Sequence, residues 1–158
     1  MKQTKQDLED WYKISDPWSY ESTHDDIVRK DRILSILDSY DNALDIGCGE
    51  GFVTKDIPAK NIFGLDISDN AALRLPPNVK RVIVPEMKYD LVMSTGTLYK
   101  QYDHETISKW IKEHSNRHVL VGGIKDWIIW SDFGNIVNEI EFKYRQYTHI
   151  IRLYEVVA

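Results

Sequence analysis

The chain has 158 residues, 42% hydrophobic and 28% charged, which is enough for one compact domain and too few for two of ordinary size. Its net charge of −5 argues against a nucleic-acid partner, and no apolar run is long enough to cross a membrane. The single cysteine, Cys48, excludes an internal disulfide, and the first residues carry no apolar signal segment. We therefore expect one cytoplasmic domain over residues 1–158, with neither nucleic acid nor membrane as a partner.

The first clear helix is predicted to begin at Ser22 or Thr23, because each has an aspartate three residues later, as in a capping box. It should run to about residue 38 and bury one apolar face, formed by Ile27, Leu34 and Leu37. The basic stretch 28–32 is interrupted by an acid and is expected to be a solvated part of this helix. Residues 1–26 precede most of the helix and form an aromatic-rich N-terminal segment.

Strands and helices then alternate along the chain. Apolar strands are predicted at 43–46, 61–65, 79–84, 89–94 and 119–121, with helices at 70–75 and after Asp103. The last two strands, 136–144 and 148–157, are joined by only about three residues and must be antiparallel. This order predicts an α/β fold with a mostly parallel sheet, helices on both faces and a C-terminal antiparallel hairpin. Ligands of such sheets bind beyond the carboxyl ends of the strands.

The link between the third and fourth predicted strands is unusually short. Only residues 85–88 separate them, whereas a parallel crossover generally needs a dozen or more residues. Two alternatives follow: part of 79–88 crosses the sheet without a helix, or the third strand is lost. In either case the fold is shortened around the third strand. Glu86 is a weak candidate for an acid on this side of the site.

The stretch ALDIGCGEGF, residues 43–52, places a glycine-rich loop directly after a buried strand. A dinucleotide-binding loop needs glycine or alanine where this chain has Phe52, and the Gly-Lys-Ser/Thr of a phosphate loop is absent. The loop instead has Asp45 two residues before glycines at 47, 49 and 51. This pattern disfavours a nicotinamide-binding oxidoreductase.

Asp45-x-Gly47-x-Gly49-x-Gly51 resembles motif I of the class I S-adenosylmethionine-dependent methyltransferases. Asp66, at the end of the next strand, and YDLVMSTGTLY at 89–99 are similar to further motifs of that family. The resemblance implies a Rossmann-like fold and S-adenosyl-L-methionine as cofactor, with Asp66 accepting the ribose hydroxyls. The residues it implies as cofactor-binding are Trp18, Asp45, Gly47, Cys48, Gly49, Gly51, Asp66, Ile67, Ser68, Ser94 and Thr95.

Residues 16–20, DPWSY, followed by RKDRIL at 29–34, resemble the N-terminus of the nodulation-type N-methyltransferases and related sugar methyltransferases. The resemblance implies that residues 1–26 form a lid over the cofactor. Aromatic faces in such a lid suit a sulfonium cation. The alternative, that the rings simply pack the segment on the sheet, stays open for each of them.

The acceptor is expected near the loop at 95–104. His104 is a candidate base and Tyr99 a candidate orienting group, although His104 is equally typical of a surface histidine at a helix start. Asp126, Trp127 and Trp130 are expected either to wall the acceptor pocket or to pack on the core. His114 and His118 lack a third ligand nearby, so no metal site is predicted.

The leading hypothesis is therefore methyl transfer to a nitrogen or oxygen atom of a small molecule or sugar. The alternative is a non-catalytic module that keeps the fold and binds the cofactor. The acceptor itself and the oligomeric state are not defined by the sequence.

Overall fold

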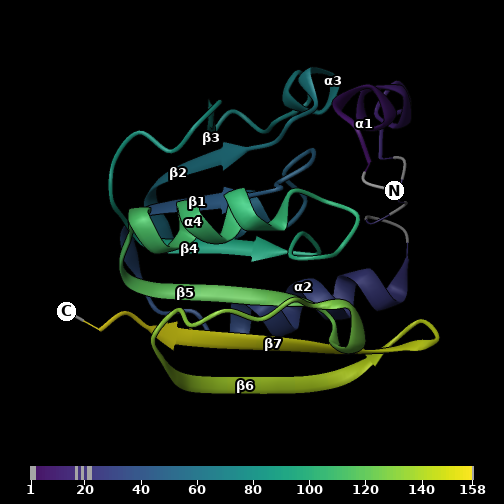
Figure 1. Ribbon diagram of the computed structural model, residues 1–158. Helices are drawn as coiled ribbons and strands as arrows, with labels where there is room; N and C mark the ends of the chain where they lie inside the picture. The colour runs from purple at the N-terminus through teal and green to yellow at the C-terminus, as the bar shows by residue number, and fades with distance from the viewer. Residues whose placement is uncertain (1–2, 17, 19, 21–22, 158) are drawn as a thin grey trace.

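The computed structural model describes residues 3–16, 18, 20 and 23–157, which form a seven-stranded sheet in the order β3-β2-β1-β4-β5-β7-β6 (Figure 1). Strands β1 to β5 are parallel to one another, and β7 lies antiparallel between β5 and β6. The predicted α/β architecture with a closing antiparallel hairpin is thus confirmed. The strands are β1 (Tyr40–Ile46), β2 (Ala59–Leu65), β3 (Val79–Val82), β4 (Tyr89–Thr95), β5 (Ser115–Ile124), β6 (Asn135–Tyr144) and β7 (Tyr147–Glu155).

Two longer helices pack on opposite faces of the sheet. Side chains alternate along β1, so Leu44 joins a core with Ile111 of α4, while Ala43 joins a second core with Ile33 of α2. Asp103 caps α4 by accepting the Thr106 amide, as predicted. No helix in the described part of the chain is long and apolar enough to span a membrane. The helices are α1 (Lys5–Trp11), α2 (His24–Ser35), α3 (Asp69–Ala72) and α4 (His104–His114), with short 3-10 turns η1 (Thr54–Asp56) and η2 (Lys125–Trp127).

The predicted apolar face of α2 is only partly right: Leu34 and Leu37 pack against the second core, but Ile27 does not. Its buried residues are Asp26, Arg29 and Ile33, whereas Ile27 is largely exposed and Leu34 and Leu37 are only partly buried. The physical reason is pairing: Asp26 accepts hydrogen bonds from side chains of the β6–β7 turn region, which offsets the cost of burying its charge. Arg29, expected on a solvated surface, is buried beside it. The helix ends at Ser35, and Thr23 is its N-cap without a side-chain hydrogen bond; Ser22 lies outside the described residues.

Helix α1 is not among the predicted elements. Thr4 and Asp7 form a reciprocal capping box at its start, in which each side chain accepts a hydrogen bond from the other residue's backbone amide. The helix lies against α3, at the β3 side of the sheet (Figure 1). The aromatic N-terminal segment therefore begins with an ordered helix and turns toward the sheet after Trp11.

The third strand is retained, and the chain crosses the sheet without a helix. Strand β3 pairs with β2 at the edge, while β4 lies beyond β1, so residues 83–88 pass three strand spacings, or about 14 Å. Val82 is level with Ser94, so the chain must also return five residues, or about 17 Å, along the strand direction to reach Tyr89. The straight path is then about 22 Å, which seven extended residue steps of about 24 Å in total just span. The first of the two alternatives is thus the correct one. Glu86 lies on this crossing segment, where its amide donates to the Tyr89 hydroxyl at the start of β4 (3.4 Å).

Candidate functional site

The glycine loop follows β1 and is fixed against the end of β2. The amides of Gly47 and Cys48 both donate to the carbonyl of Leu65, at 2.7 and 3.2 Å. Gly47, Gly49 and Gly51 have φ values of +80°, +56° and +86°, a region that residues with a Cβ rarely adopt. The alternating glycines are therefore required by the backbone path of the loop.

Asp66 meets this loop as the sequence predicts. One carboxylate oxygen accepts the Gly49 amide at 2.8 Å, and the other accepts the Ser68 amide at 3.0 Å. The Ser68 hydroxyl in turn accepts the Ala71 amide and caps α3. Burial raises the pKa of Asp66, and the two backbone hydrogen bonds oppose that shift. Each oxygen keeps a further lone pair with which to accept a ligand hydroxyl. Ile67, between these groups, is half exposed.

Asp45 carries an unsatisfied acceptor directly below the loop. Its side chain is 4% exposed; Oδ2 accepts the Thr54 hydroxyl at 2.7 Å, while Oδ1 is buried without a hydrogen-bond partner. Burial raises the pKa of this carboxyl to about 7, against the opposing effects of Thr54 and of the Arg29 charge. A buried acceptor without a donor costs free energy. An ammonium group, directly or through a water molecule, would satisfy it.

Side chains from two different segments of the chain contact the glycine loop. A Cβ added at Gly49 would lie 2.7 Å from the Tyr12 hydroxyl, and one at Gly47 would overlap the Thr97 methyl group. The Thr97 hydroxyl is hydrogen-bonded to the Ser94 hydroxyl, which donates to the Ile46 carbonyl at 3.0 Å. The N-terminal segment and the loop after β4 thus both contact the loop, and Ser94 links β4 to β1. Thr95 ends β4 beside them.

Cys48 is a packing residue of the same loop. A Cβ added at Gly64 of β2 would lie 2.8 Å from the Cys48 sulfur. Burial raises the pKa of the thiol, and the neighbouring acids Asp45 and Asp66 add to that shift. The thiol is therefore protonated near neutral pH, and its contact with Gly64 fixes the loop against β2.

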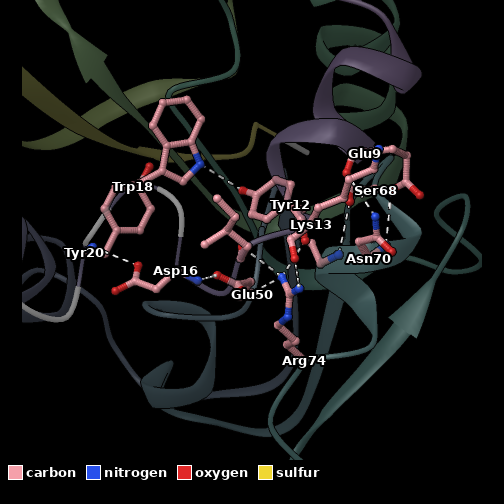
Figure 2. A network of polar contacts seen from close by, with 12 residues as sticks. Glu9, Tyr12, Lys13, Asp16, Trp18, Tyr20, Glu50, Ser68, Asn70 and Arg74 are labelled. Atoms are coloured by element: carbon pink, nitrogen blue, oxygen red, sulfur yellow. Dashed lines mark hydrogen bonds and ion pairs between the residues drawn. The ribbon is translucent and has the colours of Figure 1, made fainter.

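The predicted aromatic segment reaches the loop through a residue that the sequence analysis did not single out. The Trp18 indole N–H donates to the Tyr12 hydroxyl at 3.1 Å, and Tyr12 is buried against Gly49 (Figure 2). Trp18 also packs between Trp11 and Tyr20, with ring centroids at 5.1 and 6.2 Å. The density of aromatic residues in this stretch was the available signal, but it did not distinguish Tyr12 from its neighbours.

A buried cation lies at the edge of the site. Arg29 is 7% exposed, its guanidinium lies 5.0 Å from the centroid of the Tyr20 ring, and its Nε is 3.5 Å from the Asp26 carboxylate. Its charge opposes the effect of burial on the pKa of Asp45 and of Tyr99. A carboxylate-bearing ligand would suit this cation. Hydrophobic periodicity does not predict this position, because a buried arginine interrupts the apolar pattern of the helix.

The predicted acceptor-side residues lie on separate elements. The Tyr99 hydroxyl is buried at the end of β5, where it accepts the Ile124 amide at 2.7 Å, and burial raises its pKa to about 12. His104 begins α4, with Nε2 at 3.3 Å from the Glu105 carboxylate. Trp127 is 43% exposed and packs edge-on against Tyr99 at 5.6 Å. It also packs at 5.1 Å against Tyr147, so an exposed aromatic surface forms beside Tyr99.

The remaining candidates are accounted for by structural contacts. Trp130 lies under the Arg152 guanidinium, at 3.9 Å from its ring centroid. His114 bonds the Met87 carbonyl at 2.8 Å, and His118 bonds the Tyr40 hydroxyl at 2.8 Å. Within the described residues, no group of three His, Cys, Asp or Glu side chains could hold a metal ion.

Two cavities can be placed relative to the site. One of about 590 Å³ lies near the amino ends of the strands and is lined by residues such as Tyr40, Lys60 and Arg117, away from the glycine loop. The other, of about 150 Å³, lies between the N-terminal segment and the loop and is lined by Tyr12, Trp18 and Glu50 among others. The smaller cavity is the one that adjoins the glycine loop, through Cys48 and Gly51, and it is bounded by charged as well as aromatic groups.

A scan against protein-family models found no match to this chain, and a search of curated proteins by sequence found none either. Solved structures do match. The N-methyltransferase NodS from Bradyrhizobium japonicum, crystallised with S-adenosyl-L-homocysteine, has a TM-score of 0.82 at 15% identity over 98% of each chain. The magnesium protoporphyrin IX methyltransferase ChlM from Synechocystis, crystallised with S-adenosylmethionine, has a TM-score of 0.71 at 14% identity over 97% of each chain.

A third match shows how far this likeness extends. The [4+2]-cyclase SpnF has a TM-score of 0.70 at 11% identity, over 99% of this chain and 97% of its own. Proteins with this fold therefore include one named for a different reaction, and fold alone does not define the chemistry. The predicted resemblance is confirmed at the level of architecture: the chain has the Rossmann-like fold of the class I S-adenosylmethionine-dependent methyltransferases.

Proposed function

We propose that this protein is an S-adenosylmethionine-dependent methyltransferase that transfers a methyl group to a nitrogen or oxygen atom of a small molecule or sugar. The observation that carries the proposal is the glycine loop hydrogen-bonded to Asp66 above a buried Asp45 whose Oδ1 lacks a donor. NodS and ChlM, which share the fold, were crystallised with the product and with the cofactor respectively. That supports the same cofactor here.

Three charged side chains suit the ribose, the ammonium and the carboxylate of that cofactor. Asp66 would accept the ribose hydroxyls, and Asp45 would satisfy its unpaired oxygen with the ammonium. Arg29, a buried cation with Tyr20 stacked on it, would hold the carboxylate. The glycine loop, with Ile67, Ser68, Ser94 and Thr95 around it, would form the rest of the cradle. S-adenosyl-L-methionine supplies a sulfonium-bound methyl group, which a nucleophile displaces in line.

The protein's own contribution would be alignment and exclusion of water. Tyr12 and Trp18 would cover the cofactor side, with residues 1–26 acting as the lid of a single domain. The exposed face of Trp127, beside Tyr99, offers a surface for a flat acceptor. His104 would take the proton that an amine or hydroxyl acceptor loses, because histidine is the most common general base in enzymes. The net charge of −5 favours such an acceptor over nucleic acid.

Calorimetric titration with S-adenosylhomocysteine at pH 7 tests the cofactor. Binding is expected for the wild-type protein and is expected to be lost in Asp66→Ala. Asp41→Ala is the matched control, because Asp41 is an exposed acid at the other end of β1, paired with Lys60. No binding to the wild-type protein would refute the proposal.

Transfer of a labelled methyl group to a panel of amines, alcohols, sugars and bulk RNA tests the reaction. Label in a small amine, alcohol or sugar is expected, and label in RNA alone would contradict the proposed acceptor class. Cofactor binding without transfer to any acceptor would instead favour the non-catalytic module. Activity that is retained in His104→Gln would exclude His104 as the base.

A further inference from the structure

A single arginine side chain fastens the N-terminal segment across the glycine loop. We call the described residues 12–16, 18 and 20 the lid segment. The Arg74 guanidinium donates to three consecutive carbonyls of this segment (Figure 2). The distances are 2.6 Å to Tyr12, 3.1 Å to Lys13 and 3.1 Å to Ile14. One planar side chain thus holds the backbone of the segment where it leaves α1.

The glycine loop supplies the partner of this arginine. Glu50 lies between Gly49 and Gly51, and its Oε2 accepts from Arg74 at 3.0 Å. Its Oε1 accepts the backbone amide of Asp16 at 2.6 Å, so the same carboxylate also holds the lid segment directly. The Glu50 and Arg74 side chains are 16% and 30% exposed, which shields the pair from solvent more than a surface ion pair.

The hold on the lid segment is separate from the hold on α1. Helix α1 is attached to α3 through Glu9, whose backbone and side chain accept from Asn70 at 3.0 and 3.2 Å. Ile14, in contrast, is mostly exposed, so little apolar burial anchors the middle of the lid segment. Loss of the arginine would therefore release residues 12–16 while α1 stays in place.

Tyr12 connects this hold to the proposed cofactor site. Its carbonyl is bound by Arg74, while its hydroxyl packs against Gly49, whose amide is bonded to Asp66. A movement of the backbone away from Arg74 would lift the Tyr12 ring off the loop. The arginine thus controls a group that lies next to the atoms proposed to bind the cofactor, without itself belonging to them.

We propose that Glu50 and Arg74 form a latch that keeps the lid segment closed on the bound cofactor and so limits the rate at which the cofactor leaves. The inference rests on the proposed function, because it assumes a ligand under the lid segment. Both are positioning residues that act through Tyr12 and Trp18. Their loss should raise the dissociation rate constant without slowing association, since the glycine loop and Asp66 remain intact.

Stopped-flow measurement of S-adenosylhomocysteine binding, read by tryptophan fluorescence, tests the latch. Removal of charge-assisted hydrogen bonds in Arg74→Gln is expected to raise the dissociation rate constant about tenfold. Arg74→Lys keeps a positive charge for Glu50 but cannot span three carbonyls, so an intermediate increase is expected. Glu50→Gln should also give an intermediate increase, because the amide oxygen can still accept from Asp16.

Arg117→Gln is the matched control. Arg117 likewise hydrogen-bonds a backbone carbonyl, that of Ser39, and a carboxylate, that of Asp38, but near the amino ends of β1 and β5. Its dissociation rate constant should equal the wild-type value. Thermal melting of every variant separates release of the lid segment from general unfolding. Arg74→Gln with an unchanged dissociation rate constant, or the same increase in Arg117→Gln, would overturn the latch.

Amide hydrogen exchange measures the latch without any ligand. The Asp16 amide should exchange faster in Arg74→Gln and in Glu50→Gln, while the amides of β1 keep their protection. Unchanged exchange at Asp16 in both variants would also refute the latch. Failure of the wild-type protein to bind S-adenosylhomocysteine would instead refute the proposed function, so the two failures can be told apart.

Discussion

Substitution of Gly49 by alanine should disturb the site by two separable effects. Gly49 has φ +56°, and an L-residue in that region costs about 1 to 2 kcal/mol. The new Cβ would also lie 2.7 Å from the Tyr12 hydroxyl, so Tyr12 must shift and lose its hydrogen bond from Trp18, worth about 1 kcal/mol. The expected total loss in free energy of unfolding is about 2 to 3 kcal/mol.

A double-mutant cycle with Tyr12→Phe isolates the second effect. Without the hydroxyl, the nearest ring atom would lie 3.6 Å from the new Cβ, which is an ordinary contact. Gly49→Ala should therefore cost about 1 kcal/mol less in the Tyr12→Phe background than in the wild type, as measured by urea unfolding. An equal cost in both backgrounds would show that Tyr12 does not lie on Gly49.

Three further predictions follow from buried groups and from the exposed aromatic surface. Burial lowers the pKa of His149 to about 3, below the value of about 6.5 in an unfolded chain. The unfolded state therefore binds the proton first, and the free energy of unfolding falls as pH drops below about 6.5. Relative to His149→Phe, the wild-type protein should lose about 2 kcal/mol between pH 7 and pH 5 in urea unfolding; parallel pH profiles would refute this. Burial raises the pKa of Asp45 to about 7, above its value in the unfolded chain, so the effect on stability has the opposite sign. The free energy of unfolding of the wild-type protein should rise by about 2 to 3 kcal/mol relative to Asp45→Asn as pH falls from 8 to 5. A constant difference between the two proteins would show that Asp45 is ionised throughout. Trp127→Ala should raise KM for the acceptor severalfold and leave the calorimetric affinity for S-adenosylhomocysteine unchanged. A weaker affinity for S-adenosylhomocysteine would place Trp127 at the cofactor and not at the acceptor.

The parts of the site that the sequence predicts are those set by local geometry. Asp45, the alternating glycines and Asp66 lie at the ends of adjacent parallel strands, so strand order alone brings them together. The closing hairpin follows in the same way from a short connection. In both cases the backbone path of the strands determines which residues lie next to one another.

The parts that the sequence does not predict depend on contacts between distant residues. Arg74 follows a four-residue helix, and nothing near it in the chain indicates that it binds carbonyls 60 to 62 positions earlier. Arg29 and Asp26 occupy buried positions that periodicity assigns to apolar residues, because Asp26 pairs with Arg29 and also with Arg145 at the β6–β7 turn. Polar side chains can occupy positions that the helical periodicity assigns to the core where their hydrogen-bond partners come from elsewhere in the fold.

The carbonyl contacts of Arg74 have a consequence for how this protein can change. Every residue carries a carbonyl, so Arg74 would hold the backbone of the lid segment whatever side chains stand at positions 13 and 14. Ile14 is mostly exposed, and Lys13 pairs with Asp10 on the surface. The side chains at these two positions are therefore free to vary in size and polarity while Arg74 still holds the backbone of the lid segment. Divergence or directed evolution can reshape the outer surface of the lid there independently of how tightly it closes.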